Sequence, residues 1–276
     1  MINEPTPLEL SENLVRRPLV MTIGGFDPSG AGLQADIETC SALGVHALPI
    51  VTAVTIQNTK SIERILPLAA DDVSAQITHL LADVAKPSVC KIGMLPNREV
   101  LHAVIDTLNR WLSDIPIVLD PILKSTSGTT FVDPVMLATL RNWLSRITLL
   151  RPNADEACTI TDQPEITRAG EALSKLSRYV LITGTDQARD GQVEHVLFFD
   201  GRVHQRYHWP LRKGTFHGSG CTLTTSIAAY LARGESIESA VNSAQAFTWH
   251  AINAGYSIGG KQAIPARAIL PAHLSD

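Results

Sequence analysis

The stretch TFHGSGCTLTTSIAAYLARG, residues 215–234, places two glycines and a cysteine directly before an apolar stripe. Leu223, Ile227 and Leu231 form this stripe with a spacing typical of a helix, and Gly234 is expected to end it. The first turn of a helix has unpaired backbone N–H groups and the positive end of the helix dipole, and both favour an anion. The stretch therefore predicts an anion-binding site at the start of a helix.

Three residues at this helix start, Gly218, Ser219 and Gly220, form what we call the cradle. Its glycines have no Cβ, so the backbone can approach an anion closely. The same position is expected to lower the pKa of the Cys221 thiol. Donors for an anion beside a base suit the transfer of a phosphoryl group to a hydroxyl. The alternative is a tight turn with a core cysteine, since cysteine is among the most often buried residue types.

Short apolar runs alternate with helical patterns along the chain, which predicts an α/β fold with a mostly parallel central sheet and helices on both faces. Residues 195–209 predict a small antiparallel hairpin that turns at Asp200 and Gly201. Two further helices are expected after this hairpin. The other strands are predicted near 19–23, 89–93, 115–120, 147–153 and 179–184, and the other helices near 33–43, 73–84, 100–111, 133–144, 156–161 and 165–177.

No linker, repeat or low-complexity tract divides the chain, so a single domain is predicted over 19–276. Residues 1–18 are polar and contain proline, and they are predicted to be a flexible tail. Ligands of open α/β sheets bind at the carboxyl ends of the strands. This rule places several loops around one crevice with the cradle: those after Ile23, Gly93, Asp120, Asn153 and Gly184.

Composition excludes several functional classes. The chain has 276 residues, 45% of them hydrophobic, and no apolar run approaches the ~18 residues that a membrane span needs. A net charge of −4 shows no basic surplus, which argues against a nucleic-acid partner. The four cysteines include no Cys-x-x-Cys pair, which argues against a zinc site or a disulfide framework and predicts a cytoplasmic protein.

Six segments carry a resemblance to a known family. They read, in order, LVMTIGGFDPSGAGLQADIETCSALG from residue 19, TAVTIQNT, KIGML, LDP, RPNADEA and HGSGCTL. In this order and spacing the chain resembles the hydroxymethylpyrimidine/phosphomethylpyrimidine kinases of the ribokinase-like superfamily, from about residue 19 to about residue 254. The resemblance implies phosphorylation of 4-amino-5-hydroxymethyl-2-methylpyrimidine, and then of its monophosphate, for thiamine synthesis. ATP would be the co-substrate and Mg²⁺ the cofactor.

The resemblance also implies roles for the cradle and for the substrate site. Cys221 would be the base that deprotonates the substrate hydroxyl, while the backbone N–H groups of the cradle would stabilise the moving phosphoryl group. Four residues match the pyrimidine-binding positions: Gly25, Asp36, Gln57 and Met94. A carboxylate and an amide can together satisfy the donor and acceptors of an aminopyrimidine edge. The ordinary alternatives are a solvated carboxylate, a loop amide and a methionine that fills the core.

Asn153 and Glu156 match an Asn-x-x-Glu element that organises Mg²⁺ and the ATP phosphates in the family. Magnesium needs only one or two carboxylates, so Glu156 with Asp120 would suffice. Asn153 also suits the N-cap of a helix, and both roles can hold at once. His217 adjoins the cradle, and a structural role is expected for it because Cys221 already occupies the position of the base.

The strand at 179–184 ends in Thr183, Gly184 and Thr185, where the family typically has Lys-Gly-Gly. The hydroxyls of Thr183 and Thr185 are therefore predicted to contact the ATP phosphates, with Lys213 supplying the missing cation. Pyridoxal kinase is an alternative, since pyridoxal also carries a hydroxymethyl group on a heteroaromatic ring. A pyrimidine sensor that has lost transfer is another. A homodimer is expected from the family.

Overall fold

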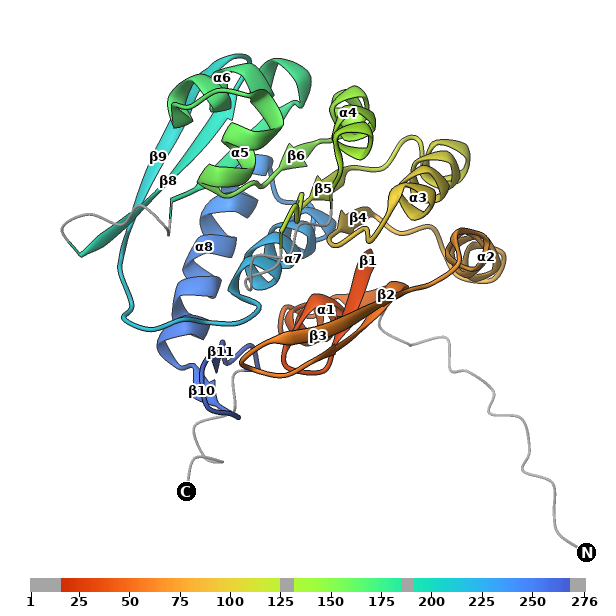
Figure 1. The fold of residues 1–276 in the computed structure, drawn as a ribbon, viewed down its shortest axis with the longest axis horizontal. Helices are drawn as coiled ribbons and strands as arrows, with labels where there is room; N and C mark the ends of the chain where they lie inside the picture. The colour runs from red at the N-terminus through yellow and green to blue at the C-terminus, as the bar shows by residue number, and fades with distance from the viewer. Residues whose placement is uncertain (1–15, 125–131, 185–190, 269–276) are drawn as a thin grey trace, which may run out of the picture.

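This computed structural model describes residues 16–124, 132–184 and 191–268. A nine-stranded mixed sheet forms its centre, in the order β3-β2-β1-β4-β5-β6-β7-β8-β9 (Figure 1). The strands are β1 (Leu19–Asp27), β2 (His46–Gln57), β3 (Ile62–Pro67), β4 (Val89–Ile92), β5 (Ile117–Leu119), β6 (Leu149–Leu150), β7 (Tyr179–Thr183), β8 (Gln192–Phe199) and β9 (Arg202–Pro210). The helices are α1 (Gly32–Ala42), α2 (Ala70–Leu81), α3 (Arg98–Trp111), α4 (Pro134–Trp143), α5 (Ala154–Thr161), α6 (Ile166–Leu176), α7 (Ser219–Ala232) and α8 (Ile237–Asn253).

The six strands from β2 to β7 in the sheet order are parallel, whereas β3 at one edge and β8 with β9 at the other are antiparallel. The mostly parallel sheet predicted from the alternating pattern is therefore confirmed. The predicted hairpin is also confirmed, because Asp200 and Gly201 join β8 to β9 with φ angles of 52° and 72°. Positive φ at both central residues is the requirement of a tight hairpin turn that matches strand twist.

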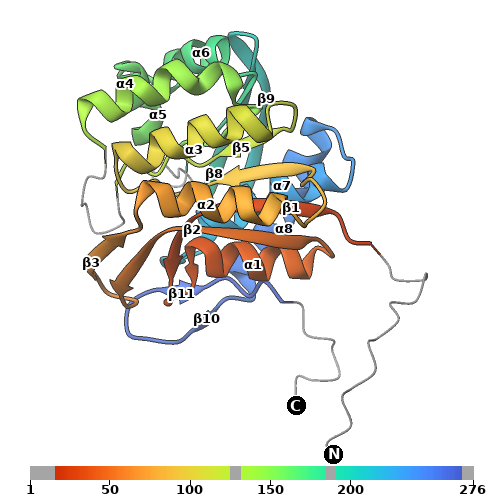
Figure 2. The same cartoon turned by 90° about the vertical axis from the view of Figure 1, so that its right-hand side faces the viewer.

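Helices cover both faces of the sheet. Figure 2 shows α2, α3 and α4 stacked on one face, with α1 on the other. Successive strand residues point to opposite faces, so Val180 and Ile182 enter the core beneath α2–α6. Tyr179 and Leu181 enter the core beneath α1, α7 and α8. Helix α3 illustrates how a local signal starts a helix: Asn97 is its N-cap, and the Asn97 side chain accepts a hydrogen bond from Val100 N.

Two antiparallel pairs were not predicted. β2 and β3 form a hairpin whose turn is closed by the side chain of Asn58, which accepts hydrogen bonds from the N–H groups of Lys60 and Ser61. A short pair, β10 (Tyr256–Ser257) and β11 (Ala263–Ile264), follows α8. It brings the C-terminal segment to the cradle, because the N–H of His217 donates to the carbonyl oxygen of Ala263 at 2.8 Å.

The strand ends place the predicted loops at one edge of the sheet. β1 does not stop at Gly24 as predicted but continues to Asp27, with a shift in its register against β2 between Gly24 and Gly25. Most of the predicted tail, residues 1–15, lies outside the described residues, as does Thr185. None of the helices in the described ranges is long and apolar enough to cross a membrane.

Candidate active site

A cavity of about 240 Å³ opens at the carboxyl ends of β1, β4, β5 and β6. The structure brings ten of the predicted site residues together in its wall. They are Gly25, Gln57, Met94, Asp120, Asn153, Glu156, Gly218, Ser219, Gly220 and Cys221. Asp36, Thr183 and Lys213 are not in the wall. The predicted crevice is therefore present for the loops after Ile23, Gly93, Asp120 and Asn153, whereas Gly184 is not in its wall.

The cradle begins α7, and its two glycines are explained by what lies behind them. Gly218 is the N-cap of α7 with φ of 79°, a conformation that favours glycine. A Cβ on Gly218 would lie 2.5 Å from Nη2 of Arg267 and 2.5 Å from the carbonyl oxygen of Gly30. A Cβ on Gly220 would lie 2.9 Å from Nη2 of Arg151. The glycines thus let two arginines approach the helix start, in addition to leaving the cavity side open.

Cys221 is both buried and part of the cavity wall, with 8% of its surface exposed. Burial raises the pKa of its thiol, and the carboxylates of Asp36 and Asp120 act in the same direction. The charge of Lys91 and the N–H of Gly32 oppose them. The lowered pKa predicted from the helix start is therefore wrong, because desolvation of the thiolate outweighs the groups that favour it.

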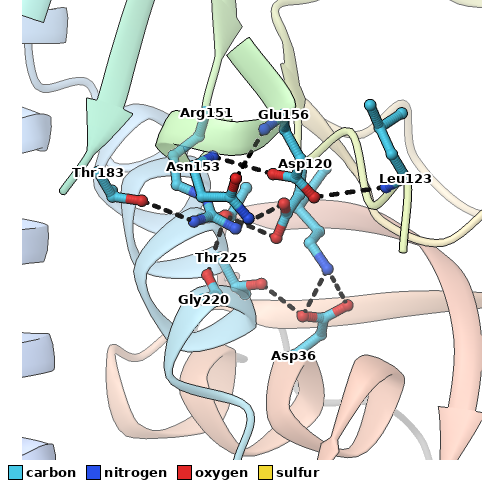
Figure 3. A network of polar contacts seen from close by, with 11 residues as sticks. Asp36, Asp120, Leu123, Arg151, Asn153, Glu156, Thr183, Gly220 and Thr225 are labelled. Carbon is cyan, nitrogen blue, oxygen red and sulfur yellow. Dashed lines mark hydrogen bonds and ion pairs between the residues drawn. The ribbon is translucent and has the colours of Figure 1, made fainter. Parts of the chain in front are cut away.

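Asp36 lies behind the cavity wall instead of in it. Its side chain is fully buried, and Nζ of Lys91 donates to both of its oxygens at 2.8 Å. The hydroxyl of Thr225 donates to the same carboxylate at 2.6 Å (Figure 3). The expectation that Asp36 contacts a pyrimidine directly is corrected accordingly: its acceptors are occupied by Lys91, which does line the cavity.

Lys91 is a charged group at the base of the cavity. Burial alone would lower the pKa of Lys91, but the charges of Asp36, Cys221 and Asp120 outweigh burial and raise that pKa. The amine therefore stays protonated. Two of its three N–H groups are directed at Asp36, and a Cβ on Gly93 would lie 3.1 Å from its nitrogen. A buried cation in this place favours negative charge in the cavity.

Arg151, a second cation in the wall, links the ends of three strands. Its Nη2 donates to Oδ1 of Asp120 at 2.5 Å, and its Nη1 donates to the hydroxyl of Thr183 at 3.3 Å (Figure 3). Thr183 is thus behind Arg151, so a direct contact of its hydroxyl with a phosphate is not what the geometry provides. Lys213 is exposed in the loop after β9 and is also absent from the wall.

Asn153 and Glu156 form a capping box at the start of α5. The N–H of Glu156 donates to Oδ1 of Asn153 at 2.8 Å, and the N–H of Asn153 donates to Oε2 of Glu156 at 2.9 Å. The N-cap role expected for Asn153 is confirmed. Both side chains also line the cavity, so they remain available to a ligand there.

Glu156 and Asp120 are the two carboxylates that face the cavity near Arg151. Burial raises the pKa of Glu156 to about 7, the charge of Asp120 adds to this, and the charge of Arg151 opposes it. A divalent cation would relieve the repulsion between the two carboxylates, and Mg²⁺ needs no more protein ligands than these. Within the described ranges there is no cluster of three or more His, Cys, Asp or Glu side chains suited to a metal.

A polar network forms the rim near the first loop. Nε2 of His217 lies 2.6 Å from Oδ2 of Asp27 and 3.1 Å from Nε2 of Gln57, which also donates to the hydroxyl of Ser29. Burial alone would raise the pKa of Asp27, but hydrogen bonds from His217 and Ser29 outweigh it and lower that pKa. His217 thus connects the first loop to the segment before the cradle, in line with its expected structural role.

Gly25 and Met94 lie against each other in the cavity wall. A Cβ on Gly25 would be 2.3 Å from Cε of Met94, so a side chain there would require the end of this methionine to move. Met94 presents an apolar surface to the cavity. Its sulfur and methyl group are suited to the face of a flat ring.

Comparison with known proteins decides the family. The sequence model described as phosphomethylpyrimidine kinase matches residues 27–266. The chain belongs to the phosphomethylpyrimidine kinase family. A hydroxymethylpyrimidine/phosphomethylpyrimidine kinase from Rhizobium meliloti is 35% identical over 245 residues, which is 86% of this chain and 91% of that protein. A protein of the same description from Streptomyces coelicolor is 34% identical over 261 residues, covering 89% and 93%.

One further relative is longer. The chloroplastic thiamine biosynthetic bifunctional enzyme of Arabidopsis thaliana is 34% identical over 256 residues, and the chain spans 48% of its length. Among solved structures, the phosphomethylpyrimidine kinase of Clostridium difficile superposes with a TM-score of 0.73 at 30% identity, covering 86% of this chain and 100% of that one. The ADP complex of Bacillus subtilis pyridoxal kinase gives 0.82 at 23% identity, covering 91% and 98%, which shows the fold alone. The predicted ribokinase-like fold is confirmed.

Among the residues that the structure describes, three cations line the cavity of this chain, and the predictions from sequence gave none of them a role. Each lies in or just after one of the family motifs. Lys91 stands in KIGML, Arg151 stands in RPNADEA, and Lys124 follows LDP. A signal was present for two of them, since Lys91 lies within a buried strand and Arg151 directly follows one. A charge in such a place needs a partner, and here the partners are the carboxylates of Asp36 and Asp120.

Proposed function

We propose that the protein transfers the γ-phosphoryl group of ATP to the hydroxymethyl group of 4-amino-5-hydroxymethyl-2-methylpyrimidine and then to the resulting monophosphate. The observation that carries this proposal is one cavity wall shared by Cys221, the cradle, Gln57 and Met94. A base and anion donors thus face the same space as a polar and an apolar contact for a ring. The names of the Rhizobium and Streptomyces relatives support both phosphorylations.

The transfer step follows from the positions of these groups. The sulfur of Cys221 accepts the proton of the acceptor hydroxyl, and the oxygen so formed attacks the γ-phosphorus. The bond from this phosphorus to the bridging oxygen of ADP breaks, and ADP leaves. Lys91 is the cation that favours the thiolate form of Cys221, which is the form that accepts the proton.

The negative charge of the transferred group is met by the chain from two directions. The backbone N–H groups of the cradle point out of the start of α7, and Arg151 lies directly beside Gly220. Preorganised donors of this kind stabilise a transition state because they need no rearrangement. Glu156 and Asp120 would hold Mg²⁺, which supplies positive charge to the ATP phosphates when bound. Asn153 orients Glu156 through the capping box.

Recognition of the pyrimidine is assigned to Gln57 and Met94. The amide nitrogen of Gln57 is engaged with Ser29 and His217, so its Oε1 is the atom that can accept from the amino group of the pyrimidine. Met94 would cover one face of the ring. Asp36 acts on this site only through Lys91. A site that uses hydrogen bonds of this kind discriminates strongly against rings that lack the matching groups.

A coupled assay of ADP release tests the proposal, with the hydroxymethylpyrimidine, its monophosphate and pyridoxal as separate acceptors. The proposal requires turnover with the first two, at a kcat/KM well above that for pyridoxal. Faster turnover of pyridoxal would establish a pyridoxal kinase of the same fold. Binding of the pyrimidine without any ADP release would establish a sensor and overturn the kinase assignment.

The oligomeric state and the cellular location are inferred from two other features of the chain. We infer a homodimer because three exposed apolar residues, Phe26, Val54 and Leu66, form a row across β1, β2 and β3. Contiguous exposed apolar side chains are a common feature of surfaces between protein chains. We also infer a cytoplasmic location, since all four cysteines are free.

A further inference from the structure

Arg267 is the largest of the fully buried side chains in the described part of the chain, and the mechanism above does not use it. It follows β11 and lies one residue beyond the region matched by the family model, residues 27–266. A fully buried arginine is rare unless its donors are satisfied. The N–H groups of Arg267 are therefore expected to have hydrogen-bond partners inside the protein.

The guanidinium of Arg267 binds four separate segments. Its Nε donates to the hydroxyl of Thr222 in α7 at 2.8 Å, and its Nη1 donates to Oε2 of Glu38 in α1 at 2.8 Å. Its Nη2 donates to the carbonyl oxygen of Gly30 at 2.7 Å and to that of His217 at 3.5 Å. Two of these partners belong to the loops on either side of the cavity rim.

These contacts reach the cradle through its first residue. The hydroxyl of Thr222 accepts from Arg267 and donates to the carbonyl oxygen of Gly218 at 2.8 Å. A Cβ on Gly218 would lie 2.5 Å from Nη2 of Arg267, so guanidinium and cradle are in direct van der Waals contact. Arg267 itself is not part of the cavity wall. It can act on a ligand only through the backbone that it holds.

The sign of its charge shows that helix stability is not the reason for this placement. A cation beside the first turn of a helix opposes the helix dipole and is unfavourable there. The only carboxylate that pairs with Arg267 in the described residues is Glu38, whose side chain is 34% exposed. A charge that weakens the isolated helix strengthens the positive potential at the cradle, where an anion would bind.

We propose that Arg267 is a positioning residue for phosphoryl transfer, which ties the first loop, residues 27–31, to the cradle and fixes the direction of the cradle N–H groups. Its effect on rate rests on the proposed function. Its effect on the backbone of the cradle does not. Displaced donors reduce stabilisation of the transferred group, whereas the contacts of Gln57 and Met94 with the acceptor stay in place. Loss of Arg267 therefore lowers kcat more than it raises the KM for the pyrimidine.

The test compares Arg267→Ala with Arg146→Ala. Arg146 is a matched control, because its Nη2 also donates to two carbonyl oxygens, those of Leu112 and Ile115, before the amino end of β5 and away from the cavity. In the ADP-release assay, Arg267→Ala is expected to lower kcat about 100-fold, with the KM for the pyrimidine changed less than about threefold. Guanidinium ion at about 20 mM should restore kcat at least tenfold in this variant and not in Arg146→Ala.

Thr222→Val provides a second variant, since it keeps the charge and volume but removes the hydroxyl that joins Arg267 to Gly218. It is expected to lower kcat about tenfold without loss of Tm beyond that of Arg146→Ala. The inference is overturned if Arg267→Ala and Arg146→Ala lose kcat equally, if guanidinium does not restore turnover, or if Thr222→Val turns over at the normal rate.

Hydrogen exchange in the ligand-free protein separates this inference from the proposed function. The N–H groups of His217 and Thr222 are bonded to Ala263 O and Gly218 O, so their exchange reports the backbone on both sides of the cradle. Arg267→Ala should speed exchange in peptides that contain them, and Arg146→Ala should not. Unchanged exchange overturns the inference even in an active enzyme. Faster exchange in a protein without pyrimidine turnover supports the inference and refutes the proposed function.

Discussion

At Cys221 a thiol is shielded from water and yet faces the cavity, so the charges around it govern its chemistry. Lys91 lies on one side of it, with Asp36 and Asp120 acting in the opposite direction. Cysteine behaves as a small apolar residue in this surrounding until a proton is removed. The role that we propose for it as a base therefore depends on Lys91 being present and charged.

Replacing Cys221 with alanine removes the proposed proton acceptor while leaving the wall nearly intact. We expect kcat to fall roughly 10²- to 10⁴-fold, the usual contribution of a positioned base. The affinity for the pyrimidine, measured by calorimetry, should change little, since Gln57 and Met94 are untouched. Cys158→Ala is the control, because Cys158 is a free cysteine outside the wall. Near-normal turnover of Cys221→Ala would mean that another group takes the proton.

Replacing only Lys91 of the buried pair Lys91 and Asp36 should destabilise the protein strongly, whereas replacing both residues should destabilise it little. Lys91→Met leaves a buried carboxylate without its partner and is expected to lower the free energy of unfolding by about 3–5 kcal/mol. The double variant Lys91→Met with Asp36→Leu should recover most of that loss and still lack activity. Urea unfolding of the two singles and the double gives the coupling directly. A single variant that loses under about 1 kcal/mol would show that the pair is not a stabilising feature.

Helix α8 is joined to the β8–β9 hairpin by a neutral polar cluster. Oε1 of Gln245 lies 2.9 Å from Nδ1 of His195, and Nε1 of Trp209 donates to the same oxygen at 3.1 Å. Burial lowers the pKa of His195 to about 4. The hydrogen bond to Gln245 opposes this shift, and the charge of Arg151 adds to it. The element contact therefore depends on a histidine that is uncharged.

Because of this histidine, the free energy of unfolding should decrease as the pH is lowered. The pKa of His195 is about 4 when folded and 6.5 ordinarily, so the unfolded chain binds a proton that the folded chain excludes between these values. The contribution is complete above about pH 6.5 and is lost progressively toward pH 4, by roughly 3 kcal/mol in all. In urea unfolding from pH 7.5 to 4, His195→Gln should show a shallower decline than wild type or His102→Gln, an exposed control. Parallel declines would contradict the assignment.

Elements with strong local signals could be predicted, and those formed by distant partners could not. The β8–β9 turn was predictable because Asp200 and Gly201 accept positive φ. β10 and β11 are two residues each and exist because the chain returns to the cradle, which no local pattern indicates. Asp36 was assigned to a ligand because its partner, Lys91, is distant in sequence. Six of the ten wall residues were found through motifs that follow strands and resemble those of the family, and the other four, residues 218–221, through the glycine loop that starts a helix.

For the whole molecule, the row of Phe26, Val54 and Leu66 determines the expected assembly. The three residues are 39%, 40% and 42% exposed and are register partners on adjacent strands. Gly25 and Thr55, their chain neighbours, line the cavity on the other side of the same strands. Assembly through the row would thus place a second chain directly behind the substrate site.

Val54→Lys should convert the protein to a monomer, because a charge at the centre of the row cannot be buried without a partner. Light scattering after size-exclusion chromatography measures the mass. Val135→Lys serves as the control, since Val135 is 51% exposed on α4, away from the row. A wild-type mass of one chain, or a Val54→Lys mass unchanged from a dimer, would rule out this row as the interface.

The placement of hairpins at both edges of the sheet bears on how the chain acquires its structure. β2 with β3, and β8 with β9, join neighbours in sequence and close short loops, so each ribbon can form within microseconds and independently. The parallel strands between them are joined by crossover helices, so long loops must close before these strands can pair. Pairing of the parallel strands is therefore slow. We expect refolding to show early protection in the two outer ribbons and late protection in β4, β5 and β6, whose carboxyl ends carry groups that we propose for catalysis. Activity would therefore return only with the slowest kinetic phase.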